Sequence, residues 1–389
     1  MTRPPRLTTL ILMTAATTLS LNMFLPSLPA IADEFGVPYG TVTLAIGGYL
    51  AMTAVLALII GPISDRIGRR PTAILSVILF LLASLGCVTA QSWTIFLICR
   101  LGQGMMVSGY ILASAVVRDT RDHTAAASLL GYIAGAMAIA PLLGPMLGGV
   151  LQDAFGWRAN FILYAGLGAL LLIAILIDLS ETRQASATSA SGPGPLLRAP
   201  GFWAYALTVA LSTCAFYGFL AGAPIVAAQT YGLSGTSLGI GLGSITAGFM
   251  TGSFAGARLS KRFGSDPVMV AGRLIALTGL GIGVLTIGYL PETAIALFAF
   301  TLFIGLGNGL TTPTANAGAL SVIPDLAGSA AGITGALTVG LGAIATTGVG
   351  WAMTDLTTPS ALLGVLLVIK LASLASAMTA IRITRTTVR

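Results

Sequence analysis

The sequence predicts an all-α membrane protein of twelve transmembrane helices in two pseudo-symmetric halves of six, with both termini in the cytoplasm. Three observations carry this prediction: an apolar composition, apolar stretches of spanning length, and basic residues confined to alternate gaps. Of the 389 residues, 56% are hydrophobic and only 8% are charged, against about 25% charged residues in a soluble domain. The composition therefore favours a polytopic membrane protein.

Twelve apolar stretches follow one another along the chain. Each has about the ~20 residues that an α-helix needs to cross the hydrocarbon core of a bilayer. We place them at residues 7–30, 41–60, 72–90, 94–115, 125–151, 159–178, 202–228, 237–256, 268–288, 293–312, 326–350 and 361–380.

Basic residues indicate which side each gap faces. Fifteen of the nineteen Lys and Arg residues lie at the two termini and after spans 2, 4, 6 and 8, whereas the opposite gaps hold Arg158 alone. Retained cations mark the cytoplasmic side, so both termini are expected there. The net charge of +7 is then explained by the basic residues that keep these gaps on the cytoplasmic side. Because the cations are spread over six loops rather than clustered with aromatic residues, no nucleic-acid partner is expected.

A polar tract separates the two predicted halves. Residues Glu181–Pro200 are rich in Ser, Ala, Gly and Pro, which is typical of a linker, so the domains are predicted as 1–180, a linker 181–200, and 201–389. Parallel six-helix repeats are a known transporter architecture with the binding site near the membrane midplane. A short repeat supports duplication, since Ser64, Arg66, Gly68 and Pro71 recur 196 positions later as Ser260, Arg262, Gly264 and Pro267.

The turn after span 2 contains an acid that topology does not explain. Turn formation and cytoplasmic retention account for its glycines, prolines and arginines, but not for Asp65. The pattern G-x-x-x-D-R-x-G-R-R resembles the loop signature of the major facilitator superfamily, which implies a latch between the cytoplasmic ends of the halves. The carboxylate can pair with a cation and face the positive end of a helix of the other half, with span 11 as the expected partner. The residues of this predicted latch are Gly61, Asp65, Arg66, Gly68, Arg69 and Arg70.

Span 5 is rich in glycine and proline. Small residues four apart allow close packing of membrane helices, which is one explanation. The run also resembles the G-P-x-x-G-G pattern of drug–proton antiporters in the same superfamily, which implies a bent helix that packs on the other half and limits leakage at the external side. Two prolines weaken the helical hydrogen-bond ladder, so a bend is expected. The residues concerned are Pro141, Gly144, Pro145, Gly148 and Gly149.

Three cations lie inside predicted spans. Arg100 costs at least about 2.5–3.5 kcal/mol at the bilayer centre on insertion scales, so it points either to a functional role or to a side chain that extends to the external interface. Its R-x-x-Q-G context resembles the central arginine pattern of the superfamily, which implies that it faces the transport cavity. Arg273 is expected to reach the cytoplasmic interface. Lys370 lies in the middle of span 12, and the sequence offers no explanation for it.

Together with Leu21–Pro29 and Trp157–Phe161, these patterns resemble the Bcr/CflA branch of multidrug efflux proteins. Relatives of that branch usually carry an aspartate where this chain has Asn22, and the acid is implicated in proton handling. All twelve acidic residues here lie at or beyond the end of a span. Asp33 and Glu34, at the external end of span 1, are therefore the nearest candidates for a proton carrier, with facilitated diffusion as the alternative.

The absence of a central acid bears on the substrate. With Arg100 as the expected buried charge, the cavity should favour neutral or anionic amphipaths over organic cations. Asn22, Gln103 and Asn308 can supply hydrogen bonds. Apolar and aromatic walls suit polyspecific binding, although helix packing is the alternative for each wall residue. The candidates are Phe24, Tyr49, Met105, Met106, Tyr132, Phe216 and Tyr217.

The leading function is export of small lipophilic compounds by alternating access. The protein is expected to act as a monomer in the bacterial inner membrane, with protons as the coupling ion. No metal or cofactor is expected. Transport of one specific metabolite on the same fold is the alternative. An intramembrane enzyme would need a paired nucleophile and base, or metal ligands, inside the membrane. The one histidine, His123, falls in a predicted loop and the spans contain no acid, so this third class is disfavoured.

Overall fold

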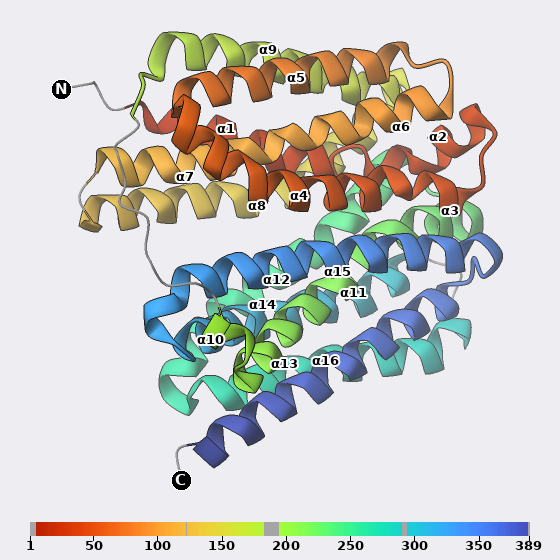
Figure 1. Cartoon of the computed structure of the whole chain (residues 1–389). Coiled ribbons are helices and arrows are strands. Elements are labelled where there is room, and N and C mark those ends of the chain that lie inside the picture. Colours follow the sequence, from red (N-terminus) through yellow and green to blue (C-terminus); the bar gives the residue numbers. More distant parts are fainter. Residues whose placement is uncertain (1–4, 122, 183–193, 290–293, 388–389) are drawn as a thin grey trace. The chain divides into compact units, whose positions relative to one another are not determined.

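The computed structural model describes residues 5–121, 123–182, 194–289 and 294–387, and every element in these ranges is helical (Figure 1). Eleven helical segments are long and apolar enough to cross a membrane, and a shorter apolar stretch, Ile139–Phe155, completes the set within the described residues. The prediction of an all-α membrane protein built from such spans is confirmed. The orientation of the termini stays a prediction.

The chain forms two compact units. Unit 1 comprises Met1–Val37, Leu44–Ala187 and Ser234–Gly239, and unit 2 comprises Pro38–Thr43, Thr188–Leu233 and Ile240–Arg389. Each unit thus contains most of one predicted half together with a short segment from elsewhere in the chain.

Unit 1 contains a first span that is broken rather than continuous. Pro26 and Pro29 lack the N–H groups that would continue a regular helix, and the chain passes through a short 3₁₀ turn before helix resumes. A second 3₁₀ turn interrupts the fourth span directly after Gly102. The elements are α1 (Leu7–Asn22), η1 (Leu25–Ser27), α2 (Leu28–Phe35), α4 (Leu44–Ile67), α5 (Arg69–Thr89), α6 (Trp93–Gly102), η2 (Gln103–Val107), α7 (Ser108–Thr120), α8 (His123–Phe155) and α9 (Arg158–Asp178).

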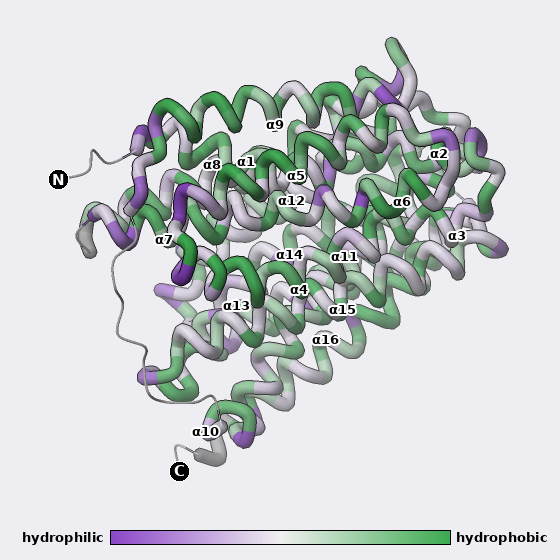
Figure 2. Tube along the Cα trace, turned by 45° about the horizontal axis from the view of Figure 1, so that its top comes forward, coloured by the Kyte–Doolittle hydropathy of each residue, from purple (hydrophilic) through white to green (hydrophobic). Residues whose placement is uncertain are grey.

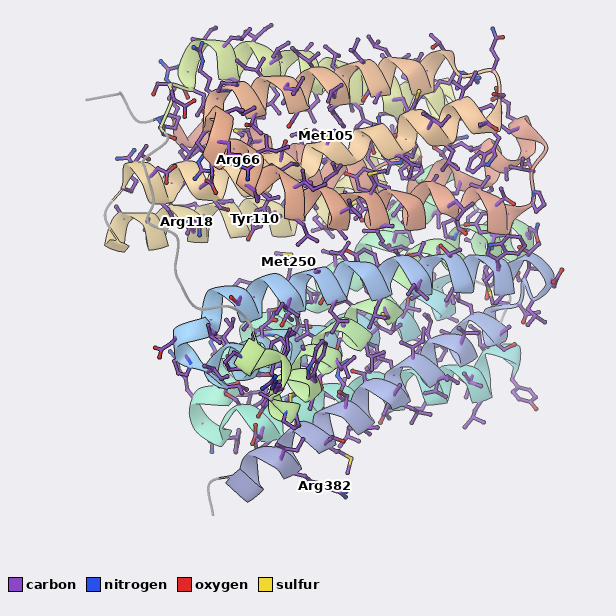
Figure 3. The ribbon with its side chains drawn as sticks, in the orientation of Figure 1. Arg66, Met105, Tyr110, Arg118, Met250 and Arg382 are labelled. Carbon is purple, nitrogen blue, oxygen red and sulfur yellow. The ribbon has the colours of Figure 1, made fainter. Side chains whose placement is uncertain are left out.

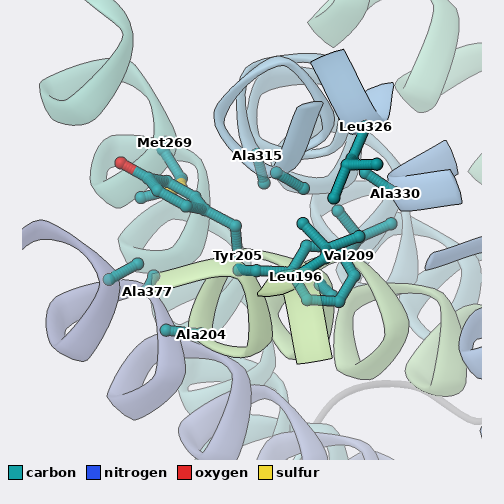
Figure 4. Packing of buried hydrophobic residues seen from close by; sticks show 13 residues of the cluster. Leu196, Ala204, Tyr205, Val209, Met269, Ala315, Leu326, Ala330 and Ala377 are labelled. Carbon is teal, nitrogen blue, oxygen red and sulfur yellow. The ribbon is translucent and has the colours of Figure 1, made fainter. Parts of the chain in front are cut away.

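Unit 2 contains α3 (Tyr39–Val42), α10 (Gly194–Leu197), α11 (Pro200–Tyr231), α13 (Ser265–Thr286), η3 (Ile287–Tyr289), α14 (Ala294–Ser321), η4 (Pro324–Leu326), α15 (Ala327–Asp355) and α16 (Pro359–Thr387), and most of α12 (Gly235–Phe263). Leu196 on α10 is fully buried in an apolar cluster with side chains of α11, α13, α14, α15 and α16 (Figure 4). The short helix is therefore anchored to the end of the bundle by an apolar side chain.

Many large apolar side chains of the helices are exposed, and hydrophobic residues run along the length of the helices in Figure 2. Leu58 on α4 is 67% exposed, Ile177 on α9 80% and Leu285 on α13 74%. On a soluble protein so many exposed apolar groups would promote aggregation. Around helices of spanning length they form the surface that contacts lipid.

Two glycines confirm that the sequence repeat is also a structural repeat. Gly68 and Gly264 have φ angles of +108° and +84°, a region that glycine enters without steric cost. Each is the residue directly before a helix, α5 and α13 respectively. The same turn therefore occurs once in each unit, at positions that the repeat relates.

Candidate functional site

The break in the first span places polar groups inside unit 1. Asn22 is the last residue of α1 and is 3% exposed, and its Nδ2 donates to the Thr18 carbonyl at 2.9 Å. On the other side of the break, Asn160 of α9 donates through Nδ2 to Ser27 Oγ at 3.1 Å. Broken helices of this kind supply substrate and ion sites in many transporters. Asn160 was not among the predicted site residues, because its contact with the break depends on how α9 packs.

Arg100 lies fully buried in unit 1, so its side chain does not extend to the external interface. The guanidinium carbon is 4.1 Å from the Phe24 ring centroid and 4.3 Å from that of Tyr49. Nε donates to the Ala45 carbonyl at 3.2 Å, and Nη1 donates to Gln103 Oε1 at 2.7 Å. Nη2 has no hydrogen-bond partner among the described residues.

The partners of Arg100 are neutral, and they are themselves held in place. Gln103 Nε2 donates to Ser84 Oγ at 2.8 Å, and the Tyr49 hydroxyl lies 2.6 Å from Ser20 Oγ. Cation–π contacts are strongest where water is excluded. The structure thus brings four predicted site residues into one buried cluster: Phe24, Tyr49, Arg100 and Gln103. Arg100 Nη2 remains available as a hydrogen-bond donor among the described residues. Whether that cluster contacts substrate stays a prediction.

The glycine-rich helix α8 approaches two backbones closely. An added Cβ at Gly148 would overlap the Met23 carbonyl in the broken span, and one at Gly149 would overlap the Gly235 carbonyl at the start of α12. Gly144 is less constrained, because the nearest atom, Leu19 Cδ2, would lie 3.4 Å away. Pro141 and Pro145 lie inside one continuous helix. Gly148 and Gly149 therefore serve as contact points between backbones.

Asp153 joins α8 to the first turn of α12 within unit 1. Its Oδ1 accepts a hydrogen bond from Gly235 N at 2.8 Å, and its Oδ2 accepts from Thr236 N at 2.8 Å and from Thr236 Oγ1 at 2.6 Å. The first N–H groups of a helix have no partner within the helix, and a carboxylate there is also favoured by the helix dipole. Asp153 therefore caps α12 from a different helix.

Replacing Asp153 by alanine is expected to destabilise the protein by about 1 kcal/mol, the usual effect of losing an N-terminal helix cap. Thermal unfolding of the purified protein in detergent measures this. Asp355→Ala, at the exposed end of α15, is the matched control and should change little. Equal midpoints for the two variants would show that the cap does not stabilise α12.

The predicted latch residues form a network at one end of unit 1. Arg69 Nη1 pairs with Asp65 Oδ1 at 2.6 Å, and Arg69 Nε pairs with Asp119 Oδ2 at 3.1 Å. Figure 3 shows Arg66 and Arg118 toward this same end of the unit, on α4 and α7. Asp65 thus pairs with Arg69, a cation of the same turn. The expected pairing with span 11 stays a prediction.

Glu181 is a member of this network that sequence reasoning missed. Its Oε1 accepts from Arg69 N at 2.9 Å and its Oε2 accepts from Arg70 N at 3.2 Å, so the carboxylate caps α5. An added Cβ at Gly68 would collide with that carboxylate, whereas one at Gly61 would meet open space. The start of the linker is therefore attached to the latch turn.

Unit 2 contains a second buried cationic cluster, and here one expectation is wrong. Arg273 does not reach the cytoplasmic interface: it is fully buried, and it donates to Thr311 Oγ1 at 2.9 Å and to the Gly307 carbonyl at 2.9 Å. Hydrogen-bond acceptors on α14 thus hold the guanidinium inside the bundle. Its Nη2 also donates to Asn308 Oδ1 at 3.0 Å, and the same oxygen accepts from Lys370 Nζ at 2.5 Å. Lys370 therefore has a partner that the sequence did not reveal.

All but one of the remaining predicted wall residues are less buried. Tyr132 is 63% exposed and Met105 is half-buried, both in unit 1. Phe216 and Tyr217 in unit 2 are half-buried and pack edge to face with ring centroids 5.5 Å apart. Met106 is fully buried, which agrees with a role in helix packing.

The two candidate proton carriers lie on α2 and are exposed. Glu34 Oε1 pairs with Arg158 Nη1 at 2.5 Å, and its Oε2 accepts from Trp157 Nε1 at 2.6 Å. Asp33 is exposed next to it. The structure thus engages Glu34 in an ion pair at the end of the span, and a role for either acid in proton transfer stays a prediction.

The sequence model of the Major Facilitator Superfamily matches residues 10–347. The chain belongs to the major facilitator superfamily. This is a family of membrane transporters rather than enzymes, so the chain is a multi-pass membrane protein of a transporter family.

Two bacterial relatives resemble this transporter over most of its length. It is 30% identical over 341 residues to the uncharacterized MFS-type transporter YdgK of Bacillus subtilis, covering 84% of this chain and 83% of the relative. It is 31% identical over 287 residues to the multidrug resistance protein MdtL of Escherichia coli, covering 72% of each chain.

Solved structures confirm the fold of the transporter. Crystal structures of a bacterial homolog of the human lysosomal transporter Spinster superpose with a TM-score of 0.80 in an inward-facing, occupied conformation and 0.75 in an inward-facing, unoccupied one. The matches cover 99% and 97% of this chain at 17% and 14% identity. At such low identity the likeness concerns the fold alone.

Proposed function

We propose that this protein exports small lipophilic compounds across the bacterial inner membrane by alternating access, as a monomer driven by protons. The observation that carries the proposal is the 31% identity to the multidrug resistance protein MdtL over 287 residues. The glycine contacts of α8 with Met23 and Gly235 support it, because close backbone packing is what the antiporter-like pattern implies.

The buried charges support neutral or anionic substrates. The partners of Arg100 among the described residues are neutral, and its Nη2 has no hydrogen-bond partner among them. Asn22 stands at the position where an acid would attract cations. An unneutralised cation in a low dielectric repels organic cations and attracts anions and dipoles.

A drug-susceptibility panel tests the proposal. The protein is expressed in a bacterium that lacks its own efflux pumps, beside an equally expressed Arg100→Lys variant. We expect higher inhibitory concentrations for several neutral or anionic lipophilic compounds, little change for organic cations, and loss of the effect in the variant. Protection against none of the compounds would contradict multidrug efflux. Transport confined to a single compound would favour a specific metabolite transporter instead.

A further inference from the structure

Two cations in unit 2 are fully enclosed by protein. Arg273 on α13 and Lys370 on α16 have no exposed surface, and both donate to Asn308 Oδ1 on α14, at 3.0 and 2.5 Å. Lys370 Nζ also donates to the Ser212 carbonyl on α11 at 3.1 Å. Three helices thus meet at one neutral amide oxygen that two cations share, and Lys370 connects this oxygen to the Ser212 carbonyl of a fourth helix, α11.

No counter-charge accompanies this pair among the described residues. The acids that the structure describes in unit 2 all lie at helix ends: Asp266, Asp325 and Asp355. The titratable groups near Lys370 are Arg273 from α13 and the neutral thiol of Cys214 from α11. Charged side chains inside membrane spans are rare and mark ion or proton pathways.

The two cations differ in chemistry. A guanidinium is not deprotonated in proteins, so Arg273 keeps its charge, and its hydrogen bonds to Thr311, Gly307 and Asn308 hold it in place. A buried lysine can exist as either ammonium or amine. The described residues offer Lys370 two acceptors, which match the two N–H groups of an amine. Only Lys370 can change the charge of the cluster.

We propose that Lys370 is a proton-binding residue of the transport cycle, taking up a proton in one conformational state and releasing it in another. The inference deepens the proposed function and rests on it, since it supplies the coupling site that the membrane-embedded acid provides in relatives. Its charge acts directly on α11 and α14 through the Ser212 carbonyl and Asn308 Oδ1. The protonation state therefore bears on how those two helices pack.

The composition of the chain allows a direct test, because Lys261 and Lys370 are its only lysines. We would label the full-length protein with ¹⁵N-lysine and record the Nζ signals in lipid nanodiscs from mildly acidic to mildly alkaline buffer, assigning them with Lys261→Arg. We expect the Lys370 signal to change from ammonium to amine within that range.

Two variants sharpen the measurement. Arg273→Gln removes the neighbouring charge, so Lys370 should stay an ammonium at higher pH than in the wild type. Arg258→Gln removes an exposed cation on α12 and should leave the Lys370 titration unchanged.

Two results would overturn the inference. One is a Lys370 signal that stays that of an ammonium throughout the range. The other is an ammonium signal that moves only when chloride or acetate is added at constant pH, which would assign the cluster to anion binding. Because the spectra need no substrate, a negative susceptibility panel would leave the proton site standing, and an unchanging ammonium would leave efflux standing.

Discussion

Replacing Arg100 by lysine is expected to abolish most transport while the protein still inserts and folds. The guanidinium lies over the rings of Phe24 and Tyr49, and it donates to the Ala45 carbonyl and to Gln103 Oε1. A compact ammonium cannot reproduce this planar, stacked arrangement. Hydrogen bonds of charged groups are worth about 1.5–3 kcal/mol each, so losing even one corresponds to roughly a tenfold loss of activity or more.

Efflux from cells that express equal amounts of each variant measures the effect. Arg118→Lys is the matched control, because that arginine lies at the exposed end of α7 and its Nε bonds to the Ser114 carbonyl of its own helix. It should export as the wild type does. Full activity of Arg100→Lys would show that Arg100 serves as a charge in the bundle rather than as a donor of defined geometry.

Adding one methyl group at Gly148 should have the second large effect. The new Cβ would overlap the Met23 carbonyl and lie 3.0 Å from Asn160 Oδ1, and neither backbone can move freely. Overpacking of this kind costs about 1–3 kcal/mol. Gly148→Ala is therefore expected to lower the thermal unfolding midpoint and to impair efflux, because α8 must shift away from the broken span.

Gly135→Ala on the same helix is the control. Apart from the backbone of its own turn, no atom of the described residues lies within 4 Å of a Cβ built there. Alanine is also the better helix former, so this variant should be at least as stable as the wild type. If Gly148→Ala and Gly135→Ala unfold at the same temperature, the close approach of α8 to Met23 does not exist in the folded protein.

Spans and turns could be predicted from the sequence because they depend on local properties. Hydropathy averaged over a helix length identifies a membrane span without knowledge of its neighbours, and the positive φ of Gly68 and Gly264 follows from a repeated local pattern. Arg100 and Gln103 lie three residues apart on adjoining turns, so their contact was also within reach of a sequence argument.

Contacts between distant segments could not be predicted in this way. Lys370 and Asn308 are 62 positions apart, and Arg273 and Ser373 are 100 apart. Hydropathy does not specify which face a buried helix turns toward which neighbour. The same reason explains why Glu181 was read only as part of a linker, although its carboxylate caps α5. An arginine near a span end is expected to extend to the interface unless acceptors such as Thr311 and Gly307 bind it first.

The break in the first span also affects the order in which the protein can be made. Ser27 receives its hydrogen bond from Asn160, 133 positions later in the chain, and the Leu19 carbonyl receives one from Tyr164, 145 positions later. The first span has a mean hydropathy of 1.4, against 2.4 for α9, so it partitions into lipid less strongly than the helix that completes it. Both donors lie on α9, so the first span can complete these two hydrogen bonds only after the sixth span has been made. The first span therefore reaches its final hydrogen bonding late in synthesis rather than when it is first made.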